Sequence, residues 1–308
     1  MTADSTTTSR WIRLAPVAFV LLWSTGFIAA KAGVAHAGPF TLLFYRFVLA
    51  VALLLPLARM LGSRWPQRPA LAGHIAVAGL LLHAGYLGGV FAAIAAGMPA
   101  GMVALIVGLQ PLVTAAAAGP LLGEQVRPLQ WLGLAAGFGG VALVVAGRLA
   151  PGTAAQTLAG FGGDALLFAL LALFAITGGT LYQKRFCAGM DLVSGAVIQY
   201  AASGAALGVL AVWLESLRAD WGLPLLLALA WLILVLSIAA IGLLLLLIRH
   251  GAASRVASLF YLVPPVTALE AWWLFDERLG PQALAGMAVI AGAVFMVFHL
   301  PARQHPSA

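Results

Sequence analysis

The sequence predicts an all-α integral membrane protein with ten transmembrane helices, arranged as two inverted five-helix repeats. Three observations lead to this fold class. First, 63% of the 308 residues are hydrophobic and 8% are charged, whereas a soluble globular domain carries roughly 25% charged residues. Second, the apolar residues form ten runs, most of them close to the roughly 20 residues that a helix needs to cross the hydrocarbon core. Third, the second half of the chain repeats the first.

The ten predicted helices are bounded by charges and by Gly or Pro breaks. Their ranges are 12–31, 39–60, 71–95, 99–121, 127–147, 164–184, 192–214, 223–248, 252–274 and 280–300. Most connections are very short, so we expect sequential helices to be antiparallel neighbours. The connection 148–163 is rich in Gly, Pro, Thr and Gln and is the predicted linker between a first repeat, 12–147, and a second, 164–300. Residues 1–11 and 301–308 are predicted cytoplasmic tails.

The distribution of basic residues predicts the orientation. The net charge is +7, but the Lys and Arg residues are scattered singly between apolar runs, so we expect a lipid bilayer and no nucleic acid as partner. Placing the N-terminus in the cytoplasm puts most of these residues on the cytoplasmic side, as the positive-inside rule requires. We therefore predict a multi-pass protein of the cell (inner or plasma) membrane with both termini in the cytoplasm.

Sequence motifs for several kinds of chemistry are absent. The chain has no phosphate-binding GxxxxGK[ST] loop, no HExxH, no Cys/His cluster and no GxSxG elbow. It has one cysteine, Cys187, so an internal disulfide is impossible. We expect no cofactor, no metal and no enzymatic activity.

The repeat relates the two halves by a constant offset of 153 positions without a gap. The matches include Pro111 and Pro264, Val113-Thr114-Ala115 and Val266-Thr267-Ala268, Glu124 and Glu277, Gly26 and Gly179, and Lys31 and Lys184. Five helices in each half is an odd number, so the second half enters the membrane from the opposite side. Inverted repeats are common in secondary transporters, where they give alternating access to a site near the midplane. The repeat therefore predicts a transporter of a small-molecule substrate.

With these motifs, the chain resembles the EamA-type transporters of the drug/metabolite transporter superfamily. The resemblance rests on residues 22–31, Tyr45-Arg46-Phe47, 110–114 with 123–125, and 254–266 with 276–278. Thr177-Gly178-Gly179 departs from the pattern, because the sixth helix lacks the tryptophan found in the first. The resemblance implies export of amino acids, with aromatic and threonine-like ones among the candidates, or of related small metabolites. It also implies a central cavity, and it allows a homodimer through the peripheral helices 127–147 and 280–300.

Nine residues are candidate substrate-binding residues because they place polar or aromatic groups within apolar helices. Ionisable side chains in a bilayer are costly unless they are paired or hydrated. Three of the nine, Arg46, His83 and Glu270, carry such side chains. Tyr86 lies three residues after His83 and shares its helix face. Gln110 directly precedes Pro111, and Tyr261 lies three residues before Pro264, at prolines that interrupt helices. The nine are Trp23, Arg46, His83, Tyr86, Gln110, Tyr182, Gln199, Tyr261 and Glu270.

Most of the candidates also have a structural interpretation. Arg46 could extend to the outer surface instead of binding an anion. His83 could be hydrogen-bonded inside a tight helix contact made by nearby glycines. Gln110 and Tyr261 could mark kinked helices only, and Glu270 could be a solvated rim residue instead of a site for a substrate amine or a proton. Trp23 and Gln199 could serve packing alone.

Glu124 and Glu277 follow their helices at equivalent positions, so we interpret them as structural, with Glu277 pairing with Arg278 or Lys31.

A multidrug or toxic-cation extruder is the main alternative function, and it would use Glu270 or aromatic groups to bind cations. An intramembrane enzyme is less favoured, because no spacing joins Arg46, His83 and Glu270 into one cluster.

Overall fold

A computed structural model describes residues 5–122, 162–240 and 259–277, with isolated positions between 131 and 140, at 243 and 247, and between 280 and 292. Apart from an isolated bridge between Ala37 and Ala219, all regular structure in these parts is helical. Two compact units are present: Met1–Gln110 with Gly160–Glu277, and Pro111–Ala159 with Arg278–Ala308. The first unit contains the helix pairs and the side-chain contacts of the candidate site.

Six described segments are long and apolar enough to cross a membrane, which agrees with a membrane protein. They are Leu14–Val34 in α1 (Ser5–Val34), Pro39–Met60 (α2), Pro69–Ala95 (α3, Pro69–Gly79; η1, Leu80–Gly85; α4, Tyr86–Ala95), Gly163–Phe186 (α8), Leu192–Glu215 (α9, Leu192–Leu210; η2, Ala211–Glu215) and Leu223–Ala240 (α10, Leu223–Ala230; η3, Trp231–Ala240). These correspond to six of the ten predicted helices.

Two further predicted helices are described with interruptions. The fourth is divided into α5 (Ala100–Val107) and α6 (Gln110–Leu122), and the ninth is described from a 3₁₀ turn at Phe260–Leu262 (η4) into α13 (Val263–Phe275). The predicted helices 127–147 and 280–300 and the linker 148–163 lie largely outside the described residues. The total of ten helices therefore remains a prediction.

Local sequence signals explain where several helices begin. α2 starts with Pro39, whose fixed φ suits the first helical turn and whose missing N–H would have had no partner there. The carboxylate of Glu215 accepts hydrogen bonds from the backbone N–H groups of Phe40 and Thr41, at 3.0 and 2.7 Å. α9 starts after Asp191, which is its N-cap residue. The Asp191 carboxylate accepts hydrogen bonds from the backbone N–H groups of Val193 and Ser194.

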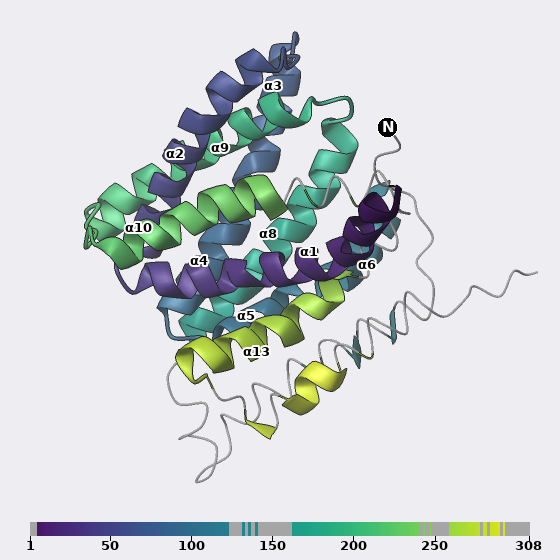
Figure 1. Ribbon diagram of the computed structural model, residues 1–308, viewed down its shortest axis with the longest axis vertical. Helices are drawn as coiled ribbons and strands as arrows, with labels where there is room; N and C mark the ends of the chain where they lie inside the picture. The colour runs from purple at the N-terminus through teal and green to yellow at the C-terminus, as the bar shows by residue number, and fades with distance from the viewer. Residues whose placement is uncertain are drawn as a thin grey trace, which may run out of the picture. The chain divides into compact units, whose positions relative to one another are not determined.

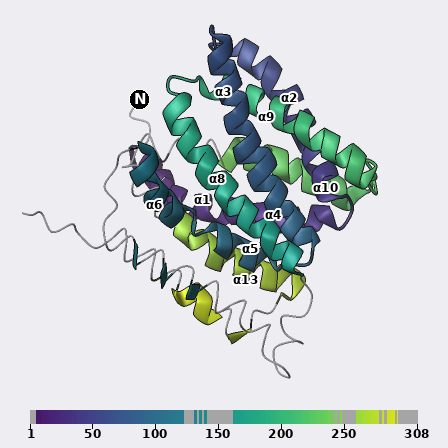
Figure 2. The same cartoon turned by 180° about the vertical axis from the view of Figure 1, so that it is seen from behind.

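Helices from the two halves of the chain are packed against one another. α2 lies along α9 and α4 lies along α8 (Figures 1 and 2), while α1 and α5 both pack on α13. Glycines allow these close approaches, as they do in many membrane helix pairs. A Cβ at Gly79 would lie 2.5 Å from Cα of Gln199, and one at Gly89 would lie 2.7 Å from the carbonyl oxygen of Phe168. The interleaved helices bring residues from both halves into one site.

Candidate functional site

A cavity of about 370 Å³ lies between helices of both halves, and we call it the aromatic cavity. Its wall is formed by α1, α2, η1, α4, α8, α9 and η3, together with the start of α6 and the η4 turn. Its aromatic lining residues are Trp23, Phe27, Tyr86, Phe91, Tyr200 and Phe260, and its other polar side chains are Arg46, His83, Gln110 and Thr180. An apolar wall with a few convergent polar groups is typical of small-molecule sites.

An aromatic cluster forms the part of the wall between α1 and η4. The rings of Phe19, Trp23 and Phe260 are in mutual contact, with centroids 5.1 to 5.3 Å apart, and the Phe260 ring meets the other two edge to face. Such aromatic pairs are worth roughly 0.5–1.5 kcal/mol beyond the area that they bury. The cluster therefore holds the Trp23 indole rigidly at the cavity surface.

Arg46 is buried on α2, with 7% of the residue exposed, and lines the aromatic cavity. Its Nη2 donates a 3.3 Å hydrogen bond to Oγ of Ser237 on η3, and its guanidinium carbon lies 5.7 Å from the centre of the Phe47 ring. Its Nε has no hydrogen-bond partner. The side chain thus faces the cavity instead of extending to the surface.

His83 lies in the π-helical turn η1 and also lines the cavity. Its Nε2 lies 3.2 Å from Oε1 of Gln199, and Nε2 of Gln199 donates to Oε1 of Gln183 at 2.7 Å. Because Oε1 of Gln199 is an acceptor, a neutral His83 carries its proton on Nε2 and leaves Nδ1 as an acceptor. Gln199 therefore helps to orient His83, together with the rings of Phe47 and Tyr200 that pack on the imidazole.

The glycines around His83 form the tight helix contact that the sequence suggested. A Cβ at Gly85 would lie 2.9 Å from Cβ of Ala175 on α8, and Gly89 approaches the α8 backbone even more closely. His83 therefore lies in a tight helix contact and also lines the cavity.

Gln110 is the first residue of α6 and lines the cavity at the break after α5. Its Nε2 donates a 3.3 Å hydrogen bond to Oγ1 of Thr180 on α8. Pro111 cannot donate a backbone hydrogen bond to the preceding turn, which is why the helix is interrupted here. Gln110 therefore lies at a break in the helix and also lines the cavity.

Three of the nine predicted residues have side chains outside the cavity lining. Tyr182 places its hydroxyl 2.7 Å from Nδ1 of His74 and packs on Phe186. Gln199 lies behind His83, as described above. Glu270, on α13, accepts a 2.8 Å hydrogen bond from Oγ of Ser24 and so joins α13 to α1. Its second carboxylate oxygen is buried without a partner.

Tyr261, another of the nine, lies within the η4 turn, and its side chain lies outside the described residues. In this turn, the described residue that lines the cavity is its neighbour Phe260. Trp23, Arg46, His83, Tyr86 and Gln110 are the predicted residues that the structure brings together.

Several lining residues were not among the predictions, although the repeat could have identified them. Adding 153 to Trp23, Phe27 and His83 gives Ile176, Thr180 and Leu236. All six of these residues line the aromatic cavity. The offset that aligns the two halves of the sequence thus also relates residues on the cavity wall.

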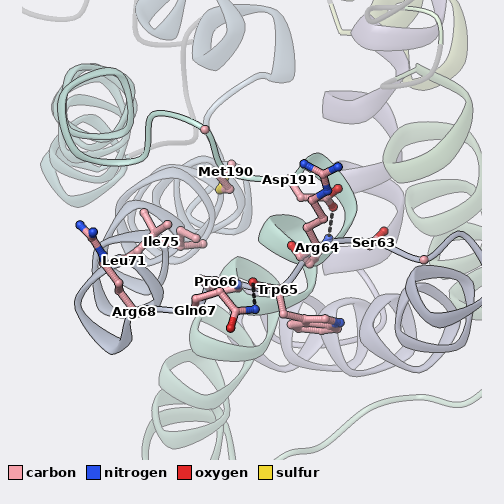
Figure 3. Close-up of a pocket in the computed structure, with 13 residues that line it drawn as sticks. Ser63, Arg64, Trp65, Pro66, Gln67, Arg68, Leu71, Ile75, Met190 and Asp191 are labelled. Atoms are coloured by element: carbon pink, nitrogen blue, oxygen red, sulfur yellow. Dashed lines mark hydrogen bonds between the residues drawn. The ribbon is translucent and has the colours of Figure 1, made fainter.

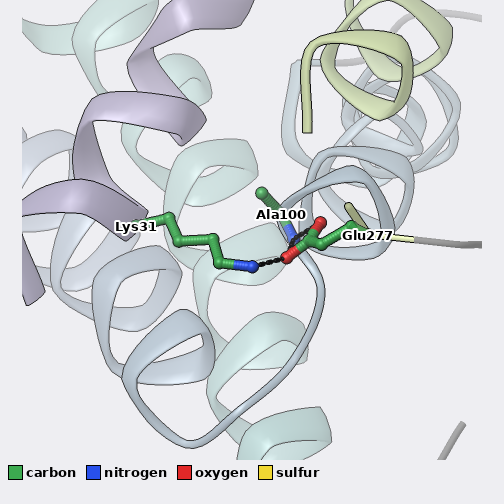
Figure 4. Close-up of polar contacts among 3 residues, drawn as sticks. All are labelled: Lys31, Ala100 and Glu277. Carbon is green, nitrogen blue, oxygen red and sulfur yellow. Dashed lines mark hydrogen bonds and ion pairs between the residues drawn. The ribbon is translucent and has the colours of Figure 1, made fainter. Parts of the chain in front are cut away.

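Glu277 forms a clasp at the ends of three helices, shown in Figure 4. Its carboxylate pairs with Nζ of Lys31 near the end of α1 and accepts a 3.1 Å hydrogen bond from the backbone N–H of Ala100 at the start of α5. The Lys31 ammonium also lies 4.8 Å from the centre of the Phe275 ring on α13. The predicted pairing of Glu277 with Lys31 is confirmed, whereas Arg278 lies outside the described residues.

A second cavity, of about 670 Å³, lies between the α2–α3 and α8–α9 connections (Figure 3). Its lining includes Arg64, Trp65, Arg68 and Asp191. Backbone N–H groups, above all that of Ser194 and also those of Arg64 and Val193, hold the pKa of the Asp191 carboxyl below its usual value. Asp191 therefore ties the two connections together as an ionised cap of α9.

Comparison with known proteins identifies the class that this fold and cavity define. The model of the EamA-like transporter family matches the chain twice, over residues 10–146 and 164–299. The chain belongs to the EamA-like transporter family and is a multi-pass membrane protein.

Similar proteins are also named as transporters or as an efflux pump. The uncharacterized inner membrane transporter YedA of Escherichia coli (strain K12) is 29% identical over 281 residues, which cover 91% of this chain and 88% of YedA. The uncharacterized transporter YvbV of Bacillus subtilis (strain 168) is 30% identical and covers 65% of this chain and 63% of its own length. A probable amino-acid metabolite efflux pump of Salmonella typhimurium is 28% identical, with 92% and 94% covered.

One crystal structure of another protein shares the fold. It matches 93% of this chain and 96% of its own, with a TM-score of 0.61 and 21% sequence identity. At this identity the likeness describes the fold alone.

Proposed function

We propose that this protein is a secondary transporter of the inner membrane that exports amino acids or related small metabolites by alternating access. Family membership supports transport, and the inner membrane transporter YedA supports the location. The relative named as a probable amino-acid metabolite efflux pump aligns over nearly its whole length and supports the substrate class.

The observation that carries the proposal is the aromatic cavity, whose walls come from both segments that match the family. Residues 153 positions apart, such as Trp23 and Ile176, line it together. This arrangement is the one expected if two inverted five-helix repeats, 12–147 and 164–300, enclose a site on their pseudo-two-fold axis. We therefore retain the ten-helix, inverted-repeat topology with both termini in the cytoplasm as part of the proposal.

The contents of the cavity favour a small molecule with both polar and apolar parts. A volume of about 370 Å³ lies at the lower end of the roughly 300–1,000 Å³ that small-molecule sites span. Tryptophan, tyrosine and phenylalanine rings offer apolar contact, while Arg46, His83 and Gln110 offer hydrogen bonds. An amino acid with an apolar side chain combines the same two features.

Alternating access requires the cavity to open to one side at a time. In the proposed topology the Lys31–Glu277 clasp lies at the outer end of the bundle and joins α1, α5 and α13. Opening toward the outside then requires this clasp to separate. π-helical turns are frequent at functional sites, and η1 and η3, which both contribute to the cavity wall, are sites where such a change of shape can begin.

The extrusion of drugs or toxic cations is a less supported function. The described cavity lining includes an arginine and no carboxylate. Glu270, the acidic residue that would bind a cation, is engaged with Ser24 outside that lining. Its unpartnered second oxygen is the one observation that favours a cation there. An intramembrane enzyme is less supported still, because Glu270 does not join Arg46 and His83 at the cavity.

Flux through the purified protein in proteoliposomes tests the proposal. Labelled amino acids and cationic dyes should be compared, each with and without a pH gradient, against empty liposomes. Saturable flux of an amino acid is expected, and its response to the gradient identifies proton coupling. Flux of dyes alone would favour the cation extruder, and an absence of flux for every compound would contradict the proposed function.

A further inference from the structure

Arg46 is a buried charge without an acidic partner in the described part of the chain. Glu277 pairs with Lys31, and the hydrogen bond from the Arg46 side chain goes to a neutral serine hydroxyl. Of the nine acidic residues, seven are described and none of these pairs with Arg46; the other two, Asp4 and Glu124, lie outside the described residues. A buried guanidinium is strongly unfavourable without charge compensation.

The surroundings leave the charged end of Arg46 available to a ligand. The guanidinium has five N–H donors in a planar fork, of which one is directed at Ser237 and another, on Nε, has no partner. The side chain lines the aromatic cavity, where the rings of Trp23 and Tyr86 are also found. In membrane helices, such residues commonly mark the path of a substrate.

Ser237 and Phe47 hold the guanidinium in place before any ligand arrives. The Ser237 hydroxyl accepts from Nη2 and itself donates to the carbonyl oxygen of Leu232, at 3.1 Å, within the π-helical η3 segment. The ring of Phe47, the next residue on α2, lies close to the guanidinium carbon. A preorganised fork loses little conformational freedom on binding, which favours a planar carboxylate.

We propose that Arg46 binds the carboxylate of the transported molecule, so that the substrates are anions or zwitterions carrying an aromatic or other apolar group. This inference rests on the proposed transport function and narrows its substrate class. The cavity should reject an amine or amide of the same shape, because either one leaves the guanidinium uncompensated. Discrimination by an unpaired buried group is stronger than discrimination by shape.

A series of matched ligands tests the inference on the unaltered protein. The probes are L-phenylalanine, 3-phenylpropionate, L-phenylalaninamide and 2-phenylethylamine, which share the ring and differ in the carboxylate and the amine. Binding to the purified protein in detergent is measured by the change in tryptophan fluorescence and by calorimetry. The two carboxylates should bind at least about tenfold more tightly than the amide and the amine, a difference of about 1.4 kcal/mol. Equal or tighter binding of the amide or amine, or no binding of either carboxylate, would overturn the inference.

Substitutions then assign the effect to Arg46. Arg46→Gln should abolish the preference for carboxylates, and Arg46→Lys should retain part of it, because the charge remains but the fork is lost. Arg59→Gln is the matched control, since Arg59 is an exposed arginine in the last turn of the same helix, and it should leave the preference unchanged. Preference for carboxylates that persists in Arg46→Gln protein with an unchanged melting temperature would overturn the assignment.

Flux measurements separate this inference from the proposed function. Carboxylate binding that depends on Arg46, without any flux in proteoliposomes, would contradict transport and leave the binding site in place. Flux of amines that is unaffected by Arg46→Gln would support transport and overturn the carboxylate site.

Discussion

Lys31 and Glu277 form an ion pair that joins the end of α1 to the residue two positions after α13, although 246 positions separate them in the chain. The same carboxylate accepts a hydrogen bond from the first turn of α5. Hydrogen bonds to charged groups are worth about 1.5–3 kcal/mol when well formed. One side chain therefore holds together three helix ends on one side of the aromatic cavity.

Glu277→Gln should open that side of the cavity. The neutral amide loses the ion pair with Lys31, so a cysteine placed at Ile176, in a Cys187→Ser background, should react several-fold faster with a membrane-impermeant maleimide added from outside. Asp220→Asn is the control, because Asp220 is an exposed carboxylate in the α9–α10 connection. Equal labelling rates in the two variants would show that the clasp does not close the cavity.

Gly79→Ala should destabilise the protein, because the added Cβ would meet the backbone of Gln199 at 2.5 Å. Neither backbone can yield without moving a helix, and overpacking of this kind costs about 1–3 kcal/mol. Gly73→Ala, on the same helix, adds a Cβ that meets nothing within 4 Å and should raise stability by about 0.5–1 kcal/mol. Thermal unfolding in detergent compares the two, and a melting temperature for Gly79→Ala at or above that of Gly73→Ala would disprove the close contact.

Gln199→Leu should impair transport more than it impairs folding. The leucine cannot accept from His83 or donate to Gln183, so the imidazole loses a hydrogen-bond partner that helps to orient it in the cavity. A fall in flux of at least about tenfold is expected, which corresponds to a loss of about 1.4 kcal/mol. Gln67→Leu, at an exposed loop position, should transport normally; a similar loss in both variants would argue against a role for the His83–Gln199 pair.

The Asp191 cap should give a pH-dependent stability difference. Its folded-state pKa lies below the unfolded value, so its contribution is full above the unfolded pKa of about 3.9 and is lost as the pH falls through the lower, folded pKa. Asp191→Ala should cost about 1 kcal/mol at pH 7, and the difference from the wild type should shrink in acid. Asp191→Asn caps without titrating, so its stability relative to Asp191→Ala should not change with pH. A wild-type advantage over Asp191→Ala that stays constant to low pH would contradict this assignment.

Much of the helix pattern could be predicted from the sequence, because the length of an apolar run is a direct consequence of membrane thickness. The break before Gln110 also followed, since Pro111 removes a backbone donor. The π-helical turns η1 and η3 could not be predicted, because one extra residue in a turn leaves no mark in residue type. They set which residues of their segments, such as His83, face the cavity.

The candidate site was predicted in part. Arg46 and His83 stood out as ionisable groups in apolar runs, and the structure places both at the aromatic cavity. Glu270 stood out for the same reason, but its depth along a helix says nothing about the direction that it faces, and Ser24, its partner, is 246 positions away. Ile176 and Leu236 are ordinary apolar residues in the sequence. They stand out only because they lie 153 positions after Trp23 and His83.

Substrate passes through the aromatic cavity in the proposed transport mechanism, and filling that cavity tests this passage. Ile176→Trp places an indole at the cavity wall on α8, whereas Leu171→Trp places one on the same helix at a position that is 51% exposed on the protein surface. Saturable flux of labelled L-phenylalanine into proteoliposomes should be lost in Ile176→Trp and retained in Leu171→Trp and the wild type, with equal amounts of folded protein. Equal flux in both variants would contradict passage through this cavity.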